Sequence, residues 1–336
     1  DSICRTHIEV AYIMNKLGIR NIAGSIVTMA LILAGQSAQG QESTGRELLA
    51  KSKRVVFLGD SITAAGQYVA NFDAWVATEL KEKAPKLIDC GLPSETVSGL
   101  SENGHASGKF PRPDLAERLD RVLKLAKPDL VIACYGINCG IYLPFDESRF
   151  EKYQQGMKRL KSAVEKSGAT FVVMTPPFYD DLRSPRSFSY NEVLDRYSDW
   201  LIGQRKEGWT VIDLHGPMSK AIRARRSTDP QFTMQPDGVH PNDAGHWFVA
   251  QQLILWAGDQ KSADADSPKS VLAGRQMPEG VLSLCQQRMS VLRDAYVGEA
   301  GHLRPGVAKG LPVSEAEAKA AELSAKISTL VDGAAK

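Results

Sequence analysis

Five short apolar runs, separated by amphipathic stretches, constrain the fold more than any other feature of this sequence. Each run is rich in β-branched residues and almost continuously apolar, which is typical of a parallel strand covered on both faces. The runs occupy residues 54–60, 86–91, 128–136, 169–177 and 209–214. Helical patterns lie near residues 72–83, 114–126, 147–167, 190–206, 216–226 and 243–257. This alternation predicts a doubly wound, three-layer α/β/α domain of the flavodoxin-like kind, with a five-stranded parallel sheet, over residues 53–258.

The composition changes after this domain. Residues 259–269 are polar and show no apolar period, which predicts a linker. Residues 270–336 carry helical patterns without strands and are expected to form a helical C-terminal appendage. Ser314 and Glu317 have the spacing of a capping box and predict the start of its second helix.

Residues 14–40 have the pattern of a secretory signal peptide. Lys16 and Arg20 precede an uncharged stretch whose apolar centre, residues 22–34, is shorter than the ~20 residues that a membrane span needs. Small residues end the segment, so cleavage is expected just before Gln41.

The other N-terminal residues are interpreted as having no structural role. Residues 1–13 precede the signal and are interpreted as a non-native upstream extension, and residues 41–52 as a short linker. Export predicts a secreted or periplasmic protein with no stable membrane insertion after the signal is cleaved.

Four cysteines follow the signal peptide, namely Cys90, Cys134, Cys139 and Cys285. An oxidising compartment permits disulfides, and four cysteines allow three pairings that the sequence cannot choose between. Buried free thiols are an equally good interpretation, because a core of this size needs no covalent support.

The charge balance argues against one class of partner. Lys and Arg total 41 against 39 Asp and Glu, a net charge of +2 with both signs interspersed. Proteins that bind nucleic acid usually show a clear basic excess, so no nucleic-acid partner is expected.

The first predicted strand runs directly into Gly59, Asp60 and Ser61. A serine at the point where a strand gives way to a helix can expose its hydroxyl at the carboxyl edge of the sheet, near backbone amide donors. Ser61 is therefore the candidate nucleophile. The alternative is that Ser61 only caps the following helix.

A serine nucleophile needs a histidine base and a carboxylate that orients the base. Two Asp-x-x-His spacings follow the last predicted strand, Asp237 to His240 and Asp243 to His246. Pro241 disfavours helical geometry at His240, and Asn242 can cap the helix that follows. Asp243 and His246 would then lie within that helix as a stabilising pair. We therefore expect Asp237 and His240 to be catalytic, with His105 and His215 as lesser candidates.

Two further segments offer hydrogen-bond donors to an oxyanion. Asn138 follows the third predicted strand, where its amide could donate to a developing negative charge, although asparagine also stabilises turns. Ser94 lies in a loop of small residues after the second strand, whose backbone amides could supply further donors.

These four segments together resemble the SGNH, or GDSL-type, hydrolase family over about residues 53–257. The resemblance implies a Ser61–His240–Asp237 triad, with an oxyanion hole formed by the amides of Ser61 and Ser94 and the side chain of Asn138. Residues that bind the rest of the substrate are not implied.

The sequence departs from the family pattern at two positions. Ser94 stands where the family usually has glycine, and serine fits less readily if the loop needs a positive φ, which leaves the amide of Gly91 as a substitute. Cys139 follows Asn138 where the family often has aspartate, a departure that bears on the fine positioning of Asn138.

The resemblance implies transfer of an acyl group to water without a metal or organic cofactor. The expected substrate is a small ester or an acylated carbohydrate carrying acetyl or another short acyl group. Residues 99–113 and 176–190 support this expectation, because they are polar and offer no apolar run that could bury a long acyl chain. The alternatives are a lipid-directed esterase, lysophospholipase or thioesterase, an O-acyltransferase, and a non-catalytic domain that binds glycans.

Overall fold

The 336-residue chain is represented by a computed structural model that describes residues 45–270 and 277–334. The predicted signal peptide (14–40) and the upstream extension (1–13) lie outside the described residues.

The predicted five-stranded parallel sheet is confirmed. Its strands are β1 (Arg54–Gly59), β2 (Lys86–Asp89), β3 (Leu130–Cys134), β4 (Thr170–Met174) and β5 (Thr210–Ile212). All neighbouring strands are parallel, in the order β2-β1-β3-β4-β5. This is the flavodoxin-like order, which reverses direction beside β1 and places a crevice at the carboxyl ends of β1 and β3.

The register of the central strands aligns the loops that follow them. Gly59, the last residue of β1, lies opposite Cys134, the last residue of β3. The chain therefore leaves both strands at the same level, which brings Ser61 and Asn138 to the same edge of the sheet. All five residues of β3 are buried, as expected for a central strand covered on both faces.

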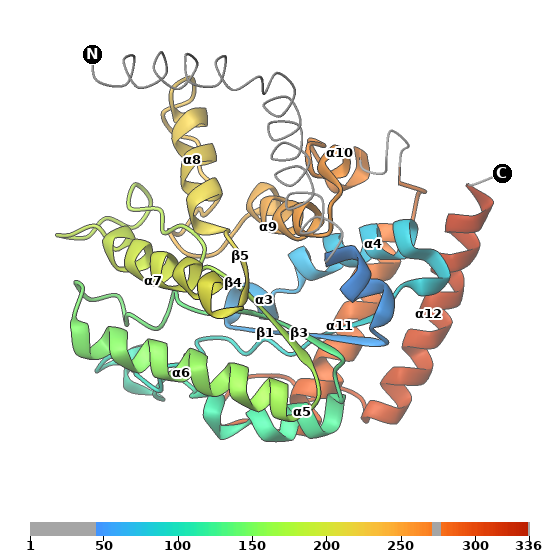
Figure 1. Ribbon diagram of the computed structural model, residues 1–336, viewed down its shortest axis with the longest axis horizontal. Helices are drawn as coiled ribbons and strands as arrows, with labels where there is room; N and C mark the ends of the chain where they lie inside the picture. The colour runs from blue at the N-terminus through green and yellow to red at the C-terminus, as the bar shows by residue number, and fades with distance from the viewer. Residues whose placement is uncertain (1–44, 271–276, 335–336) are drawn as a thin grey trace, which may run out of the picture.

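Helices cover both faces of the sheet (Figure 1). They are α3 (Ser61–Ala64), α4 (Gln67–Leu80), α5 (Leu119–Ala126), α6 (Glu147–Lys166), α7 (Asn191–Gly203), α8 (His215–Arg226) and α9 (Asp243–Trp256). Helices α4 and α9 pack together over one face, whereas α5, α6 and α7 line the other. The three-layer α/β/α architecture follows from this arrangement.

Two segments expected to be linkers are packed against the domain. Residues 45–51 are helical, and Leu49 is fully buried. In the second segment, Asp259 accepts a hydrogen bond of 2.9 Å from the indole of Trp75, and α10 (Gln260–Ala263) follows. Leu49 and Asp259 are single residues that create no periodic pattern, so the sequence predicted a linker for each segment.

The helical C-terminal appendage is confirmed. It consists of α11 (Val281–Ala300) and α12 (Val313–Gly333), which pack against each other, while α11 also contacts α4 and β2 (Figure 1). Arg293 of α11 donates a hydrogen bond of 2.8 Å to the carbonyl of Ala64 at the end of α3. The appendage thus supports the helix that begins with Ser61.

The capping box predicted at Ser314 is wrong. Helix α12 starts one residue earlier, after Pro312, and has no side-chain cap. Glu317 instead pairs with Lys86 of β2 and accepts a hydrogen bond of 2.6 Å from the hydroxyl of Tyr296. Glu317 therefore binds residues of other elements and does not form the local bond to the Ser314 backbone that a capping box requires.

The described helices and cysteines settle two further points. Within residues 45–270 and 277–334, no helix has the length and apolar character that crossing a membrane requires. Cys90, Cys134, Cys139 and Cys285 are all buried free thiols, so the structure contains them as small apolar side chains of the core.

Candidate active site

Ser61 is the first residue of α3, directly beyond the carboxyl end of β1, and is partly exposed. The residue that caps α3 is Asp60, whose side chain accepts a hydrogen bond of 3.0 Å from the amide of Ile62. The interpretation of Ser61 as the cap is therefore wrong, and its hydroxyl is available for another partner.

That partner is His240, in the loop between β5 and α9. The Oγ atom of Ser61 lies 2.9 Å from Nε2 of His240. On the other side of the ring, Nδ1 lies 2.6 Å from Oδ2 of Asp237. Oδ1 of Asp237 accepts hydrogen bonds from the backbone amides of Val239 (2.9 Å) and His240 (2.7 Å). The structure thus brings together the three residues that the sequence predicted, in a continuous hydrogen-bonded series.

Electrostatics keep Asp237 ionised. Partial burial raises the pKa of this carboxyl, but the hydrogen bonds from the His240 ring and from the two backbone amides outweigh it, so the pKa lies below its ordinary value. An ionised Asp237 accepts a hydrogen bond from the Nδ1–H group of His240, which leaves Nε2 unprotonated and able to take the Ser61 proton.

Asp60 adds a second carboxyl close to the nucleophile. Burial raises the pKa of Asp60 to about 6, against the opposing effects of the Ile62 amide and of His240.

The second Asp-x-x-His spacing lies in α9, as predicted, but its two side chains have different partners and do not form the expected pair: Asp243 accepts a hydrogen bond of 2.8 Å from the side chain of Gln67. Asp243 begins α9, which is capped by Asn242 through a hydrogen bond of 3.0 Å from the amide of Gly245. His246 is buried and stacks on Tyr68 with 6.4 Å between ring centres. Burial lowers the pKa of His246 to about 4, so it stays neutral at physiological pH.

The lesser histidine candidates lie with other carboxylates. Nδ1 of His105 is 3.2 Å from Glu102, and Nε2 of His215 is 2.8 Å from Asp195. Both pairs belong to loop and helix packing, and neither includes Ser61.

Asn138 lies beyond β3 and is only 3% exposed. Its Nδ2 donates to the backbone carbonyl of Glu95 at 3.3 Å, and its Oδ1 accepts from the hydroxyl of Tyr142 at 2.9 Å. An amide nitrogen carries two hydrogens, so one N–H of Asn138 remains for a further acceptor.

Ser94 adopts φ = +70°, the left-handed conformation that glycine accepts without strain. The loop therefore does need positive φ at this position, and serine adopts it at some cost. Gly91 is a poor substitute donor, because its amide already donates to the Asp89 carboxylate at 2.8 Å. Ser94 remains the candidate that matches the family position.

A buried ion pair that the sequence analysis missed anchors this loop. Arg118 donates two hydrogen bonds to the Glu95 carboxylate, at 2.6 and 2.7 Å, and Tyr135 donates a third at 2.6 Å. Arg118 and Glu95 are 1% and 0% exposed. The pair fixes Glu95, the residue directly after Ser94. No spacing or motif connects two charged residues that lie 23 positions apart in the chain.

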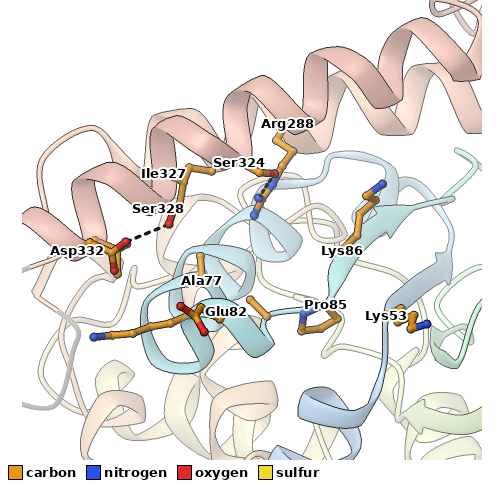
Figure 2. A pocket seen from close by; sticks show the side chains of 13 residues that line it. Lys53, Ala77, Glu82, Pro85, Lys86, Arg288, Ser324, Ile327, Ser328 and Asp332 are labelled. Carbon is orange, nitrogen blue, oxygen red and sulfur yellow. Dashed lines mark hydrogen bonds between the residues drawn. The ribbon is translucent and has the colours of Figure 1, made fainter.

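A hollow of about 380 Å³ elsewhere on the surface is not part of this site. Lys53, Pro85 and Lys86 line it on one side and α12 on the other (Figure 2). These residues precede or begin β1 and β2, so the hollow lies at the amino ends of the strands, opposite the edge where doubly wound sheets bind ligands.

Within residues 45–270 and 277–334, no group of three or more His, Cys, Asp or Glu side chains is arranged to hold a metal ion.

A doubly wound parallel sheet whose carboxyl edge joins a serine, a histidine and an aspartate by hydrogen bonds defines a serine-dependent hydrolase. Residues 57–248, more than half of the chain, match the GDSL-like Lipase/Acylhydrolase family, and the chain belongs to this family. The expected SGNH resemblance is thereby confirmed, and with it the assignment to carboxylic ester hydrolases.

One solved structure shares the fold at low sequence identity, and two others are similar to this chain. The gut microbial diltiazem-metabolizing enzyme BT4096 is 21% identical with a TM-score of 0.51, over 61% of this chain and 46% of that enzyme. This chain therefore spans less than half of the length of BT4096. LAE5, an α/β hydrolase from the metagenome of Lake Arreo, is 23% identical (TM-score 0.48; 62% and 97% covered). Axe2, an acetylxylan esterase from Geobacillus stearothermophilus, is 20% identical (TM-score 0.48; 61% and 94% covered). A comparison with curated proteins finds no significant match.

Proposed function

We propose that this protein is an exported serine esterase that removes acetyl or other short acyl groups, with acylated carbohydrate as its substrate. The observation that carries the proposal is the series of hydrogen bonds from Ser61 Oγ to His240 Nε2 (2.9 Å) and from His240 Nδ1 to Asp237 (2.6 Å). Nucleophile, base and orienting acid are the minimum set for acyl transfer through a serine.

In the first half of the reaction, Ser61 Oγ attacks the ester carbonyl carbon while His240 Nε2 takes the hydroxyl proton. Asp237 holds the ring and stabilises its positive charge. The tetrahedral intermediate collapses, the C–O bond to the alcohol breaks, and the leaving oxygen takes the proton from Nε2. The acyl group is then an ester of Ser61.

In the second half, His240 removes a proton from water, and the hydroxide oxygen attacks the acyl carbon. Collapse of this intermediate releases the carboxylic acid and returns the proton to Ser61. The backbone amides of Ser61 and Ser94 and the remaining N–H of Asn138 are the proposed donors to both oxyanions, each contributing roughly 3 kcal/mol to the lowering of the barrier.

An exposed site and polar neighbouring loops support a carbohydrate substrate. The side chains of His240 and Asp237 are 52% and 58% exposed, which leaves room for a bulky alcohol. Two long polar loops border the proposed oxyanion hole: Arg112 donates to the Ser94 carbonyl at 3.4 Å, and Arg186 donates at 3.1 Å to the carbonyl of Tyr142, whose hydroxyl contacts Asn138. These loops are polar and offer no apolar run that could bury a long acyl chain.

The test is kcat/KM for p-nitrophenyl esters from acetate to palmitate, together with acetate release from acetylated xylan. We expect the highest value for acetate, a steady fall with chain length, and release from the polysaccharide; Ser61→Ala supplies the background rate. Activity that rises with chain length, with no release from xylan, would replace this proposal with a lipid-directed esterase. Formation of new sugar esters when sugar acceptors are added would identify an O-acyltransferase.

Export is the remaining part of the proposal and rests on the sequence pattern of residues 14–40. The full chain, expressed in a bacterium, should accumulate outside the cytoplasm with Gln41 as its N-terminal residue. Recovery of the uncleaved chain from the cytoplasm alone would contradict it.

A further inference from the structure

The family often places an aspartate after the oxyanion asparagine, and Cys139 occupies that position here. Asn138 nevertheless has both ends of its amide fixed. The carbonyl of Glu95 accepts from Nδ2, and the hydroxyl of Tyr142 donates to Oδ1. The bond to the Glu95 carbonyl requires the amide nitrogen on that side of Asn138. Together with the bond from Tyr142 to Oδ1, it fixes the orientation of the amide group.

The backbone between the two residues is folded so that Tyr142 can reach back. Ile141 and Tyr142 have φ = +48° and +56°, two consecutive left-handed residues that are not glycine. Such a conformation costs free energy at each position and persists only where the surroundings hold it in place. Here the turn places the Tyr142 hydroxyl on the side chain of Asn138, four positions earlier.

The surroundings of the ring supply that support. Tyr190 stacks on Tyr142 with 4.9 Å between ring centres, and the guanidinium groups of Arg112 and Arg186 lie 5.2 and 5.0 Å from the same ring. Arg186 also donates to the Tyr142 carbonyl. Aromatic stacking and cation–π contacts on a half-buried ring restrict its rotation.

Arg112 connects this ring with the other side of the proposed oxyanion hole. Its Nη1 donates to the Ser94 carbonyl at 3.4 Å, and Glu102 holds the guanidinium with bonds of 2.6 and 2.7 Å. One rigid side chain therefore contacts both the loop that carries Ser94 and the ring that fixes Asn138.

We propose that Tyr142 is a positioning residue for the oxyanion hole, whose hydroxyl orients the Asn138 amide in the role that the missing aspartate leaves open. The inference rests on the proposed function, because it assumes that Asn138 donates to the oxyanion. Tyr142 itself is not assigned any contact with the reacting atoms.

The test is a double-mutant cycle of Tyr142→Phe and Asn138→Ala, scored by kcat and KM on p-nitrophenyl acetate. Removing the hydroxyl should lower kcat about tenfold, the effect of one hydrogen bond, with little change in KM. Asn138→Ala should lower kcat by roughly 10²–10³. In the double variant Tyr142→Phe should add nothing, because the amide that it orients is gone.

The matched control is Tyr153→Phe, which removes a different tyrosine hydroxyl, one that donates to the backbone carbonyl of Tyr135 at 3.1 Å. It should leave kcat within a factor of two and lower Tm as much as Tyr142→Phe does. A purely structural role for Tyr142 would make the two variants alike in kcat.

The remaining outcomes separate the two proposals. An unchanged kcat in Tyr142→Phe, or additive losses in the double variant, would overturn the positioning role while the proposed function stands. A normal kcat in Asn138→Ala, with Ser61→Ala inactive, would overturn the role of Asn138 and with it the inference about Tyr142.

Discussion

Arg288 of α11 forms two-point contacts with the carboxylate of Asp73 in α4, with its Nη2 2.8 Å from both carboxylate oxygens. The side chains are 11% and 3% exposed, so the pair is almost sealed from water. The appendage is therefore joined to the domain by an ion pair whose members lie 215 positions apart.

Removing one partner of this pair should destabilise the whole protein. Arg288→Met leaves the Asp73 carboxylate buried without its counter-charge, which typically costs 3–5 kcal/mol. Urea unfolding monitored by tryptophan fluorescence would measure the loss. The double variant Asp73→Asn with Arg288→Met should recover part of it, because no isolated charge remains. A loss below about 1 kcal/mol in the single variant would show that the ion pair contributes little to stability.

The choice between the two Asp-x-x-His pairs gives a direct comparison of activities. His240→Ala should lower kcat by at least 10³, about as much as Ser61→Ala, because the two act as a unit, and Asp237→Ala somewhat less. His246→Ala is the matched variant in the same spacing and should retain most of the activity while lowering Tm, since it removes a buried ring. The reverse ranking of the two histidines would overturn the assignment of the base.

Ser94 offers a test of backbone strain in the oxyanion loop. Ser94→Gly should keep full activity and leave stability unchanged or higher by up to about 1 kcal/mol, because relief at φ = +70° is offset by the greater entropy of unfolded glycine. Ser94→Ala keeps the strain and removes only the hydroxyl, so its kcat should equal that of the parent. A large loss in both variants would show that the hydroxyl contacts the substrate.

Asp89 should make stability depend on pH. Burial raises its pKa from 3.8 to about 7, against the opposing effects of the Gly91 amide, Arg293 and Arg118. Between those values the folded state binds more protons than the unfolded state, so the free energy of unfolding falls as pH rises from about 4 to about 7.

Asp89→Asn should remove this dependence of the unfolding free energy on pH. The dependence is at most about 1.4 kcal/mol per pH unit, because it comes from a difference of at most one bound proton. The variant should also be more stable than the parent above pH 7. Its side-chain oxygen can still accept from the Gly91 amide. Urea unfolding at pH 4 to 8 measures the slope, with Asp120→Asn on the exposed face of α5 as the control for a lost carboxylate. An unaltered slope would contradict the assignment.

The sequence by itself determined the sheet, the helices and the three residues of the proposed triad, because each depends on local physics. Apolar runs predict buried strands, and adjacent residues predict the strand-to-helix junction at Ser61. Pro241 and Asn242 separate His240 from His246 through steric and capping effects that act within a few positions.

Tertiary structure decided the relationships between residues that are distant in the chain. The ion pair of Arg118 with Glu95, the contact of Glu317 with Lys86, and the two arginines on the Tyr142 ring leave no periodic or spacing signal. Even Tyr142, four positions from Asn138, meets it only because neighbouring side chains hold two residues at positive φ. Propensities and caps are set by a few neighbours along the chain, whereas these contacts exist only after the sheet register and helix packing have brought the partners together.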